Sequence, residues 1–300
     1  MSSAAAPPCV VGVIGGGRMG AGIAQSFAAA GSRVVVVERD GTTATAALER
    51  IATGLRRAAE RGTLSGLSDL DVPDRVVAVS SDLDVPDRVI AVSSVAELPH
   101  DADLVVEAVP ENAGLKAEVL AAAEDVVPDG CVLASNTSSL SVTELAAALR
   151  RPGRFLGMHF FSPVPVSALV ELVPAPDTDA TALDAAVRWT HALGKQDVVV
   201  KDCPGFASSR LGLALGLEAI RMVEEGVAEP EAIDKAMRLG YRHPMGPLRL
   251  TDLVGLDVRL AIAEHLHTTL GERFAPPRLL REKVARGELG RKTGQGFYRW

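Results

Sequence analysis

A histidine and a glutamate are spaced so that a hairpin of two strands would bring them together. His159 lies in an apolar strand pattern at 155–161, and Glu171 lies in a second strand pattern at 167–173. The two residues are symmetric about Pro165, whose fixed φ and missing N–H are typical of a turn. An antiparallel return of the chain would therefore place the two side chains opposite each other.

A pair of this kind has a definite chemistry. A carboxylate beside an imidazole fixes the tautomer of the ring, orients it and stabilises its protonated form. That is what a general base needs when it removes the proton of an alcohol while hydride leaves the same carbon. The spacing alone also allows a simpler interpretation, in which His159 forms a hydrogen bond at a strand end and Glu171 is solvated.

A glycine pattern near the start of the chain predicts a site for a dinucleotide. Gly15, Gly17 and Gly20 form G-x-G-x-x-G between a strand pattern at 10–14 and a helix pattern. Gly15 allows a tight turn, Gly17 lets a pyrophosphate approach the backbone, and Gly20 lets the helix pack closely on the sheet. The first N–H groups of that helix have no internal partner, so they favour an anion.

The acidic residue after the next strand pattern indicates which dinucleotide binds. Glu38 follows the apolar run at 34–37. A carboxylate at this place suits a ribose 2′-hydroxyl and repels a 2′-phosphate, which favours NAD over NADP. Arg39 leaves the alternative open, because an arginine beside the site could hold that phosphate.

A polar cluster, SNTSS at 135–139, follows another apolar strand pattern at 131–135. Open α/β sheets bind their ligands at the carboxyl ends of the strands, so these side chains could face the nicotinamide and the reacting oxygen. Taken alone, the cluster is better explained as a polar loop with helix caps.

Strand and helix patterns alternate along the first half of the chain. Further strand and helix patterns are found at 103–109 and 113–126, and a helix pattern at 43–61 follows Glu38. This alternation predicts a Rossmann-like α/β fold with a doubly wound, mostly parallel sheet. We expect it to form a NAD-binding domain over residues 8–201.

From residue 202 onward nearly every pattern is helical, which predicts an all-helical C-terminal domain over 202–300 for substrate binding and dimerisation. Apolar residues occur all around the helix at 211–217, so both of its faces should be covered. Gly212 and Gly216 lie on one face and would permit another helix to approach closely. We therefore expect this helix in a homodimer interface.

Two nearly identical segments, 68–80 and 81–93, follow the helix pattern at 43–61 and differ only at Val77 and Ile90. Each resembles a turn followed by a short strand. A stacked repeat fold needs more copies, so a local duplication is the better interpretation. We expect the second copy to occupy the sheet, because it leads directly into the next unit.

Composition excludes several classes of protein. The net charge of −7 without a basic block argues against nucleic acid as a partner. The three cysteines are odd in number and far apart, so neither a disulfide framework nor a metal site is indicated, and a reducing compartment fits. No apolar stretch approaches the ~18 residues of a membrane span. We expect a cytoplasmic protein without membrane contact.

Together these motifs resemble those of the 3-hydroxyacyl-CoA dehydrogenase family, most closely its short members that act on 3-hydroxybutyryl-CoA. Ordered matches extend almost from end to end of the chain: VIGGGRMGAGIAQ, VVEAVPEN, ASNTSSL, GMHFFSPVPV, VELV, DCPGF, DKAMRLG, HPMGP, TDLVGLD and GRKTGQGFY. The resemblance implies reversible, NAD-dependent oxidation of a 3-hydroxyacyl-CoA to the 3-oxoacyl-CoA.

The resemblance also implies roles for individual residues. His159 would be the catalytic base, Glu171 its partner, and Ser138 the group that contacts the substrate oxygen. The cofactor residues implied are Gly15, Gly17, Gly20, Glu38, Glu111, Lys116, Asn136, Ser138, Ser162 and Lys292. The substrate residues implied are Ser138, Ser209 and Arg61, the last of which would meet the CoA phosphates or remain a solvated helix charge.

The chain departs from the family pattern at two asparagines near the reaction centre. Ser162 and Ser209 replace them, and Ser167 with Ala168 stands where relatives usually have Met-Lys. Serine is shorter and lacks the paired donor and acceptor of the amide. Losing one hydrogen bond costs about 1–3 kcal/mol, so we expect these replacements to affect which acyl group and carrier bind, and not the reaction type.

Two alternatives follow. The same hydride transfer could act on a hydroxyacyl group held by an acyl carrier protein, or the chain could bind NAD without catalysis. The presence of His159, Glu171 and Ser138 argues against the second alternative.

Overall fold

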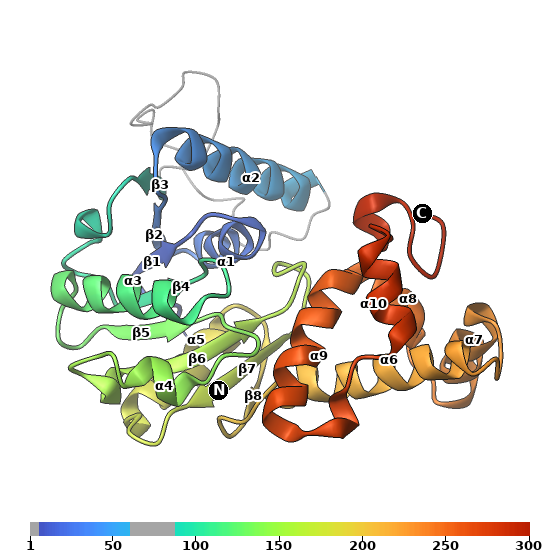
Figure 1. Cartoon of the computed structure of the whole chain (residues 1–300). Coiled ribbons are helices and arrows are strands. Elements are labelled where there is room, and N and C mark those ends of the chain that lie inside the picture. The colour runs from blue at the N-terminus through green and yellow to red at the C-terminus, as the bar shows by residue number, and fades with distance from the viewer. Residues whose placement is uncertain (1–5, 61–87) are drawn as a thin grey trace, which may run out of the picture. The chain divides into compact units, whose positions relative to one another are not determined.

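The computed structural model describes residues 6–60 and 88–300, which form two compact units. The first unit ends at Asp202 and the second begins at Cys203. Figure 1 shows the first unit in blue to yellow and the second in orange to red. Arg61, expected to contact substrate, lies outside the described residues.

Within the described residues, the first unit contains an eight-stranded sheet with the order β3-β2-β1-β4-β5-β6-β7-β8. Six strands are parallel to one another, whereas β7 and β8 run in the opposite direction. The strands are β1 (Val10–Ile14), β2 (Arg33–Val37), β3 (Val89–Val92), β4 (Leu104–Glu107), β5 (Val132–Ser135), β6 (Phe155–Phe160), β7 (Leu169–Pro174) and β8 (Gln196–Val199).

The strand order explains where a ligand can bind. β1 lies between β2 and β4, so the chain changes the direction in which it builds the sheet at this point. Connections leave the carboxyl ends of β1 and β4 toward opposite sides, which opens a crevice in folds of this kind. The predicted doubly wound, mostly parallel Rossmann-like sheet is confirmed.

Helices cover both faces of the sheet (Figure 1). Val13 of the sheet shares one apolar core with Phe27 and Ala186, which come from helices on the same face. On the other face, a Cβ added at Gly157 would lie 2.9 Å from Val142 of a neighbouring helix. The helices are α1 (Arg18–Ala29), α2 (Gly41–Glu60) and α5 (Ala180–Ala192) on the first face, and α3 (Ala113–Val126) and α4 (Val142–Ala146) elsewhere in the unit.

The duplicated segment contributes one strand to the described sheet. β3 comes from the second copy, 81–93, and pairs in parallel with β2. The expectation that the second copy occupies the sheet is therefore confirmed. The first copy, 68–80, lies outside the described residues.

The edge strand β8 has no counterpart among the strands predicted from the sequence. Its four residues are exposed or half-buried, and they include Gln196 and Asp197. Val198 and Val199 continue into Val200, but this run is shorter than the apolar runs that identify buried parallel strands. Helix α5, which precedes it, packs against β6 and β7 through small residues such as Ala182.

The second unit is helical, as predicted. Its core includes Leu213, Leu217 and Leu248. The helices are α6 (Ser208–Glu224), α7 (Pro230–Gly240), α8 (Pro247–Val254), α9 (Leu256–Leu270) and α10 (Arg278–Ala285). None of the helices in the described part of the chain is both long enough and apolar enough to cross a membrane.

Helix α6 packs closely on another helix of the same unit at one of its two glycines. A Cβ at Gly216 would lie 3.1 Å from the Thr251 hydroxyl of α8, so the missing side chain permits close packing. The opposite face differs from the expectation that both faces are covered, because Leu211 is 66% exposed and Leu215 is 44% exposed in the single chain.

Candidate active site

The predicted histidine and glutamate lie side by side on adjacent antiparallel strands. In the register of β6 and β7, His159 is directly opposite Glu171. The histidine Nδ1 lies 2.8 Å from the glutamate Oε2, and both side chains are buried. The antiparallel return expected from the spacing about Pro165 is therefore observed.

This geometry defines what the imidazole can do. An ionised carboxylate only accepts hydrogen bonds, so Nδ1 of His159 carries the proton that it donates to Glu171. In the neutral ring with this tautomer, Nε2 is the nitrogen that can accept a proton. The Phe161 ring lies 4.4 Å from the imidazole, centroid to centroid, and packs against it. The pair can therefore act as an oriented general base.

Asn136 connects the carboxyl ends of β5 and β6. The backbone N–H of Phe160 donates to its Oδ1 at 2.9 Å. Phe160 is the neighbour of His159, so this bond helps to fix the backbone beside the base. Contact between Asn136 and a nicotinamide stays a prediction.

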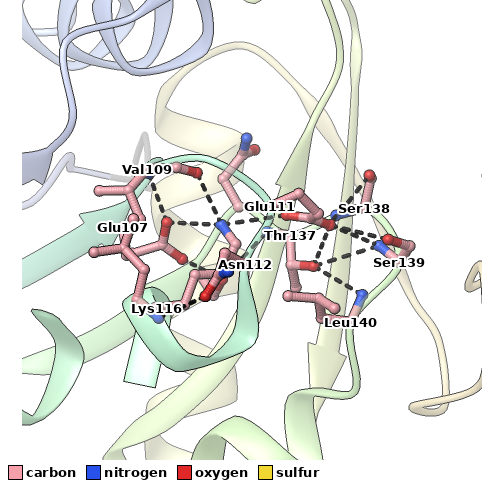
Figure 2. Close-up of polar contacts among 12 residues, drawn as sticks. Glu107, Val109, Glu111, Asn112, Lys116, Thr137, Ser138, Ser139 and Leu140 are labelled. Carbon is pink, nitrogen blue, oxygen red and sulfur yellow. Dashed lines mark hydrogen bonds and ion pairs between the residues drawn. The ribbon is translucent and has the colours of Figure 1, made fainter. Parts of the chain in front are cut away.

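Ser138 lies in a loop that Glu111 holds (Figure 2). The backbone N–H groups of Ser138 and Ser139 donate to Glu111 Oε1 at 2.9 and 3.1 Å, and the Thr137 hydroxyl donates to it at 2.7 Å. Partial burial opposes ionisation of Glu111, but the charge of Lys116 and these hydrogen bonds outweigh it and lower the pKa of Glu111. Glu111 is therefore an ionised acceptor for the loop.

Glu111 also contacts a buried ion pair. Lys116 Nζ lies 2.7 Å from Glu107 Oε1, and the two side chains are 1% and 0% exposed. Sequence reasoning missed Glu107, although it ends an otherwise apolar strand and Lys116 follows nine residues later. Glu107 lies in the strand pattern at 103–109 and Lys116 in the helix pattern at 113–126, but neither pattern indicates that the two charges pair.

The glycine loop has the geometry expected of it. Gly15 has a φ of 94°, which favours glycine. A Cβ at Gly20 would lie 1.7 Å from the Gly15 carbonyl oxygen, so only glycine fits there. At Gly17, the N-cap residue that precedes α1 and provides no side-chain cap, a Cβ would meet nothing within 4 Å. The loop thus leaves an open approach to uncapped backbone, which fits a dinucleotide phosphate.

Glu38 is positioned at the end of β2 by this same loop. Its Oε1 accepts a hydrogen bond from the Gly16 N–H at 2.7 Å, and Arg50 donates to the Gly16 carbonyl at 3.2 Å. The Arg39 side chain is 81% exposed and pairs with Asp40 at 3.2 Å, so it is directed to its neighbour in sequence. The carboxylate of Glu38 is therefore the ordered charge beside the loop.

The remaining predicted residues are divided between the two units. Ser162 is exposed in the turn after β6. Ser209 lies in the first turn of α6, and Lys292 pairs with Asp257 at 2.6 Å, both within the second unit.

Known protein families match both units. The model for the NAD binding domain of 3-hydroxyacyl-CoA dehydrogenase matches residues 10–203. The model for the C-terminal domain of 3-hydroxyacyl-CoA dehydrogenase matches residues 205–300.

Individual relatives cover nearly the whole chain. A probable 3-hydroxybutyryl-CoA dehydrogenase of Bacillus subtilis is 44% identical over 288 residues, which are 95% of each chain. The human mitochondrial hydroxyacyl-coenzyme A dehydrogenase is 39% identical, over 96% of this chain and 90% of its own. The crystal structure of (S)-3-hydroxybutyryl-CoA dehydrogenase from Ralstonia eutropha superposes with a TM-score of 0.86 at 38% identity, covering 98% of this chain and 99% of the other.

Proposed function

The chain belongs to the 3-hydroxyacyl-CoA dehydrogenase family, and we propose that it oxidises a short 3-hydroxyacyl-CoA reversibly to the 3-oxoacyl-CoA with NAD. The observation that carries the proposal is the buried 2.8 Å hydrogen bond between His159 and Glu171. The relatives named 3-hydroxybutyryl-CoA dehydrogenase support a four-carbon acyl group.

The proposed mechanism assigns one task to each side chain. His159 Nε2 accepts the proton of the 3-hydroxyl group as the carbonyl forms. Glu171 keeps the ring oriented and offsets the charge of the imidazolium. The hydroxyl of Ser138 donates a hydrogen bond to the reacting oxygen. NAD, when bound, supplies the hydride acceptor.

The cofactor would be held by the first unit. The glycine loop at Gly15, Gly17 and Gly20 would receive the pyrophosphate at the start of α1. Glu38 would accept a hydrogen bond from the ribose 2′-hydroxyl, and its negative charge would repel a 2′-phosphate.

A spectrophotometric assay tests the reaction and the carrier together. The protein is expected to consume NADH with acetoacetyl-CoA, faster than with 3-oxoacyl-CoA of longer chains. Faster turnover of 3-oxoacyl groups on an acyl carrier protein would instead support the carrier alternative raised by Ser162 and Ser209. Binding of NADH without turnover of any of these thioesters would contradict the proposed function.

The exposed leucines of α6 support a homodimer. Leu211 and Leu215 lie on the face turned away from the core of the second unit. A second copy would remove this apolar surface from water. Sedimentation at micromolar concentration is expected to give twice the mass of the chain, and a monomeric mass would contradict the dimer. A cytoplasmic location stays a prediction.

A further inference from the structure

The Lys116 ammonium group contacts three acceptors of the protein. The Nζ atom lies 2.7 Å from Glu107 Oε1, 3.2 Å from the Val109 carbonyl oxygen and 3.3 Å from Glu111 Oε2. The first two contacts are hydrogen bonds that the ammonium donates, and the third is an ion pair. With 1% of its side chain exposed, Lys116 is placed to hold protein groups rather than to reach a ligand (Figure 2).

Glu107 ties this lysine to the ends of two neighbouring strands. Its Oε1 also accepts from the Val109 N–H at 2.6 Å, and its Oε2 accepts from the Ser135 hydroxyl at 2.6 Å. The Ser135 oxygen in turn accepts from the Thr137 N–H at 3.2 Å. Burial raises the pKa of Glu107, against the opposing effect of the Lys116 charge. The pair thus joins the last residue of β4 to the last residue of β5.

Glu111 links the Glu107–Lys116 ion pair to the loop that contains Ser138. One carboxylate oxygen faces Lys116, and the other accepts the hydrogen bonds of the 137–139 loop. Glu111 is at the surface, with 35% of its side chain exposed. The buried ammonium group of Lys116 holds its Oε2 atom. The sequence of contacts is Glu107, Lys116, Glu111 and then the backbone of Ser138.

We propose that Lys116, with Glu107 as its counter-ion, is a positioning residue that sets the place of Ser138 through Glu111. The proposal rests on the proposed function, in which Ser138 contacts the reacting oxygen. It differs from the direct contact with cofactor that the family resemblance implies for Lys116. Removal of the ammonium frees Glu111 and lets the 137–139 loop move, so the Ser138 hydroxyl no longer meets the oxygen.

A double-mutant cycle between two residues that share no hydrogen bond tests this connection. Lys116→Met and Ser138→Ala are each expected to lower kcat for acetoacetyl-CoA reduction at least tenfold. The combined variant is expected to be within about threefold of the slower single variant, because the hydroxyl is already misplaced in Lys116→Met. The Kd for NADH is expected to change less than about threefold.

Two outcomes would overturn the proposal. If the two losses in kcat multiply, Lys116 acts independently of Ser138. If the Kd for NADH rises by tenfold or more while kcat is unchanged, Lys116 contacts the cofactor instead.

Lys195 offers a matched control because it is another buried lysine in the same unit. Its Nζ donates to the Val164 and Ser167 carbonyl oxygens at 2.6 and 2.7 Å, which lie in the turn between β6 and β7 and not in the 137–139 loop. The effect of Lys195→Met is expected to multiply with that of Ser138→Ala. Non-additivity in this control as well would show that loss of any buried lysine gives the same result, which would overturn the specific role of Lys116.

Lys116→Met leaves Glu107 buried without its counter-ion, so a second variant protects the test against misfolding. Glu107→Gln/Lys116→Met removes both charges of the ion pair, so no unpaired charge stays buried there. The amide introduced at position 107 can still join Ser135 and the Val109 N–H, while the connection to Glu111 is lost. This variant is expected to give the same non-additivity with Ser138→Ala, and full additivity would overturn the proposal.

Hydrogen exchange separates this proposal from the proposed function. Peptides that cover residues 136–140 are expected to exchange at least tenfold faster in the Lys116 variants than in the parent or in Lys195→Met, because Lys116 no longer holds Glu111, the acceptor of the Ser138 and Ser139 amides. A parent protein that turns over no 3-oxoacyl thioester would contradict the proposed function and leave this measurement valid. Unchanged exchange would overturn the positioning role.

Discussion

The two polar groups of the candidate site are positioned in different ways. His159 and Glu171 face each other because two antiparallel strands pair in one register, and a hydrogen bond joins them. Ser138 is positioned by side chains, through Glu111 and Lys116, which come from a loop and a helix.

The difference decides how each group responds to change. A strand register is set by many backbone hydrogen bonds and apolar contacts. A substitution of His159 or Glu171 therefore removes a reacting group but leaves the two strands in place. A network of side chains depends on each of its members, so a substitution in it moves the loop. Four substitutions test this contrast, from the largest expected effect to the smallest.

Loss of the base should be the most damaging change. His159→Gln is expected to lower kcat roughly a thousandfold, in the range measured for general bases, because no other group at that position accepts the proton. The Kd for NADH, from a fluorescence titration, should stay within about twofold of the parent. Near-full activity of this variant would show that another residue is the base.

Loss of the Glu171 charge should lower kcat less than loss of the base. Glu171→Gln keeps the shape of the side chain but cannot offset the imidazolium, so kcat is expected to fall roughly a hundredfold. Hydrogen exchange in β6 and β7 should be unchanged if register positions the pair. Faster exchange there would mean that the side-chain bond also holds the strands together.

Neutralising Glu111 should have a smaller, pH-dependent effect. Because the fold lowers its pKa, ionised Glu111 stabilises the protein above its ordinary pKa of 4.5, and that contribution is lost as the pH falls through the lowered value. Glu111→Gln is therefore expected to lower Tm and to reduce kcat about tenfold near pH 7. Thermal unfolding measured at decreasing pH should show the two Tm values converging. A constant difference would mean that the carboxylate charge is not responsible.

Restoring a family asparagine should have the smallest effect. Ser209→Asn is expected to change the KM for acetoacetyl-CoA by less than about tenfold, which corresponds to the free energy of one hydrogen bond. The Kd for NADH is expected to stay unchanged. Steady-state kinetics on CoA-bound and carrier-bound substrates would show whether the serine selects the carrier. A loss of kcat as large as that of His159→Gln would show that residue 209 takes part in the chemistry.

The same contrast explains which parts of the molecule were predictable from sequence. The His159 pair, the glycine loop and the sheet depend on short-range rules, namely strand periodicity, turn residues and backbone sterics, and these were predicted correctly. The roles of the site residues stay predictions.

The parts that escaped prediction depend on tertiary contacts. Burial of Glu107 and Lys116 depends on how α3 packs over the sheet, and no local pattern distinguishes them from surface charges. β8 was missed for a different reason, since its apolar run of Val198 to Val200 is only three residues long and follows two polar residues. Local patterns therefore predict where elements lie, while side-chain networks between elements need the structure.

The hydrogen bond between Gly16 and Glu38 has a consequence for enzyme engineering. The residue that would select the nucleotide also braces the phosphate loop, with Arg50 holding the opposite side of the same glycine. Shortening or deleting the Glu38 side chain to admit a phosphorylated ribose would therefore loosen the loop at the same time. A redesign of nucleotide preference has to supply a substitute brace, such as a glutamine that still accepts the Gly16 N–H, before the new specificity can be judged.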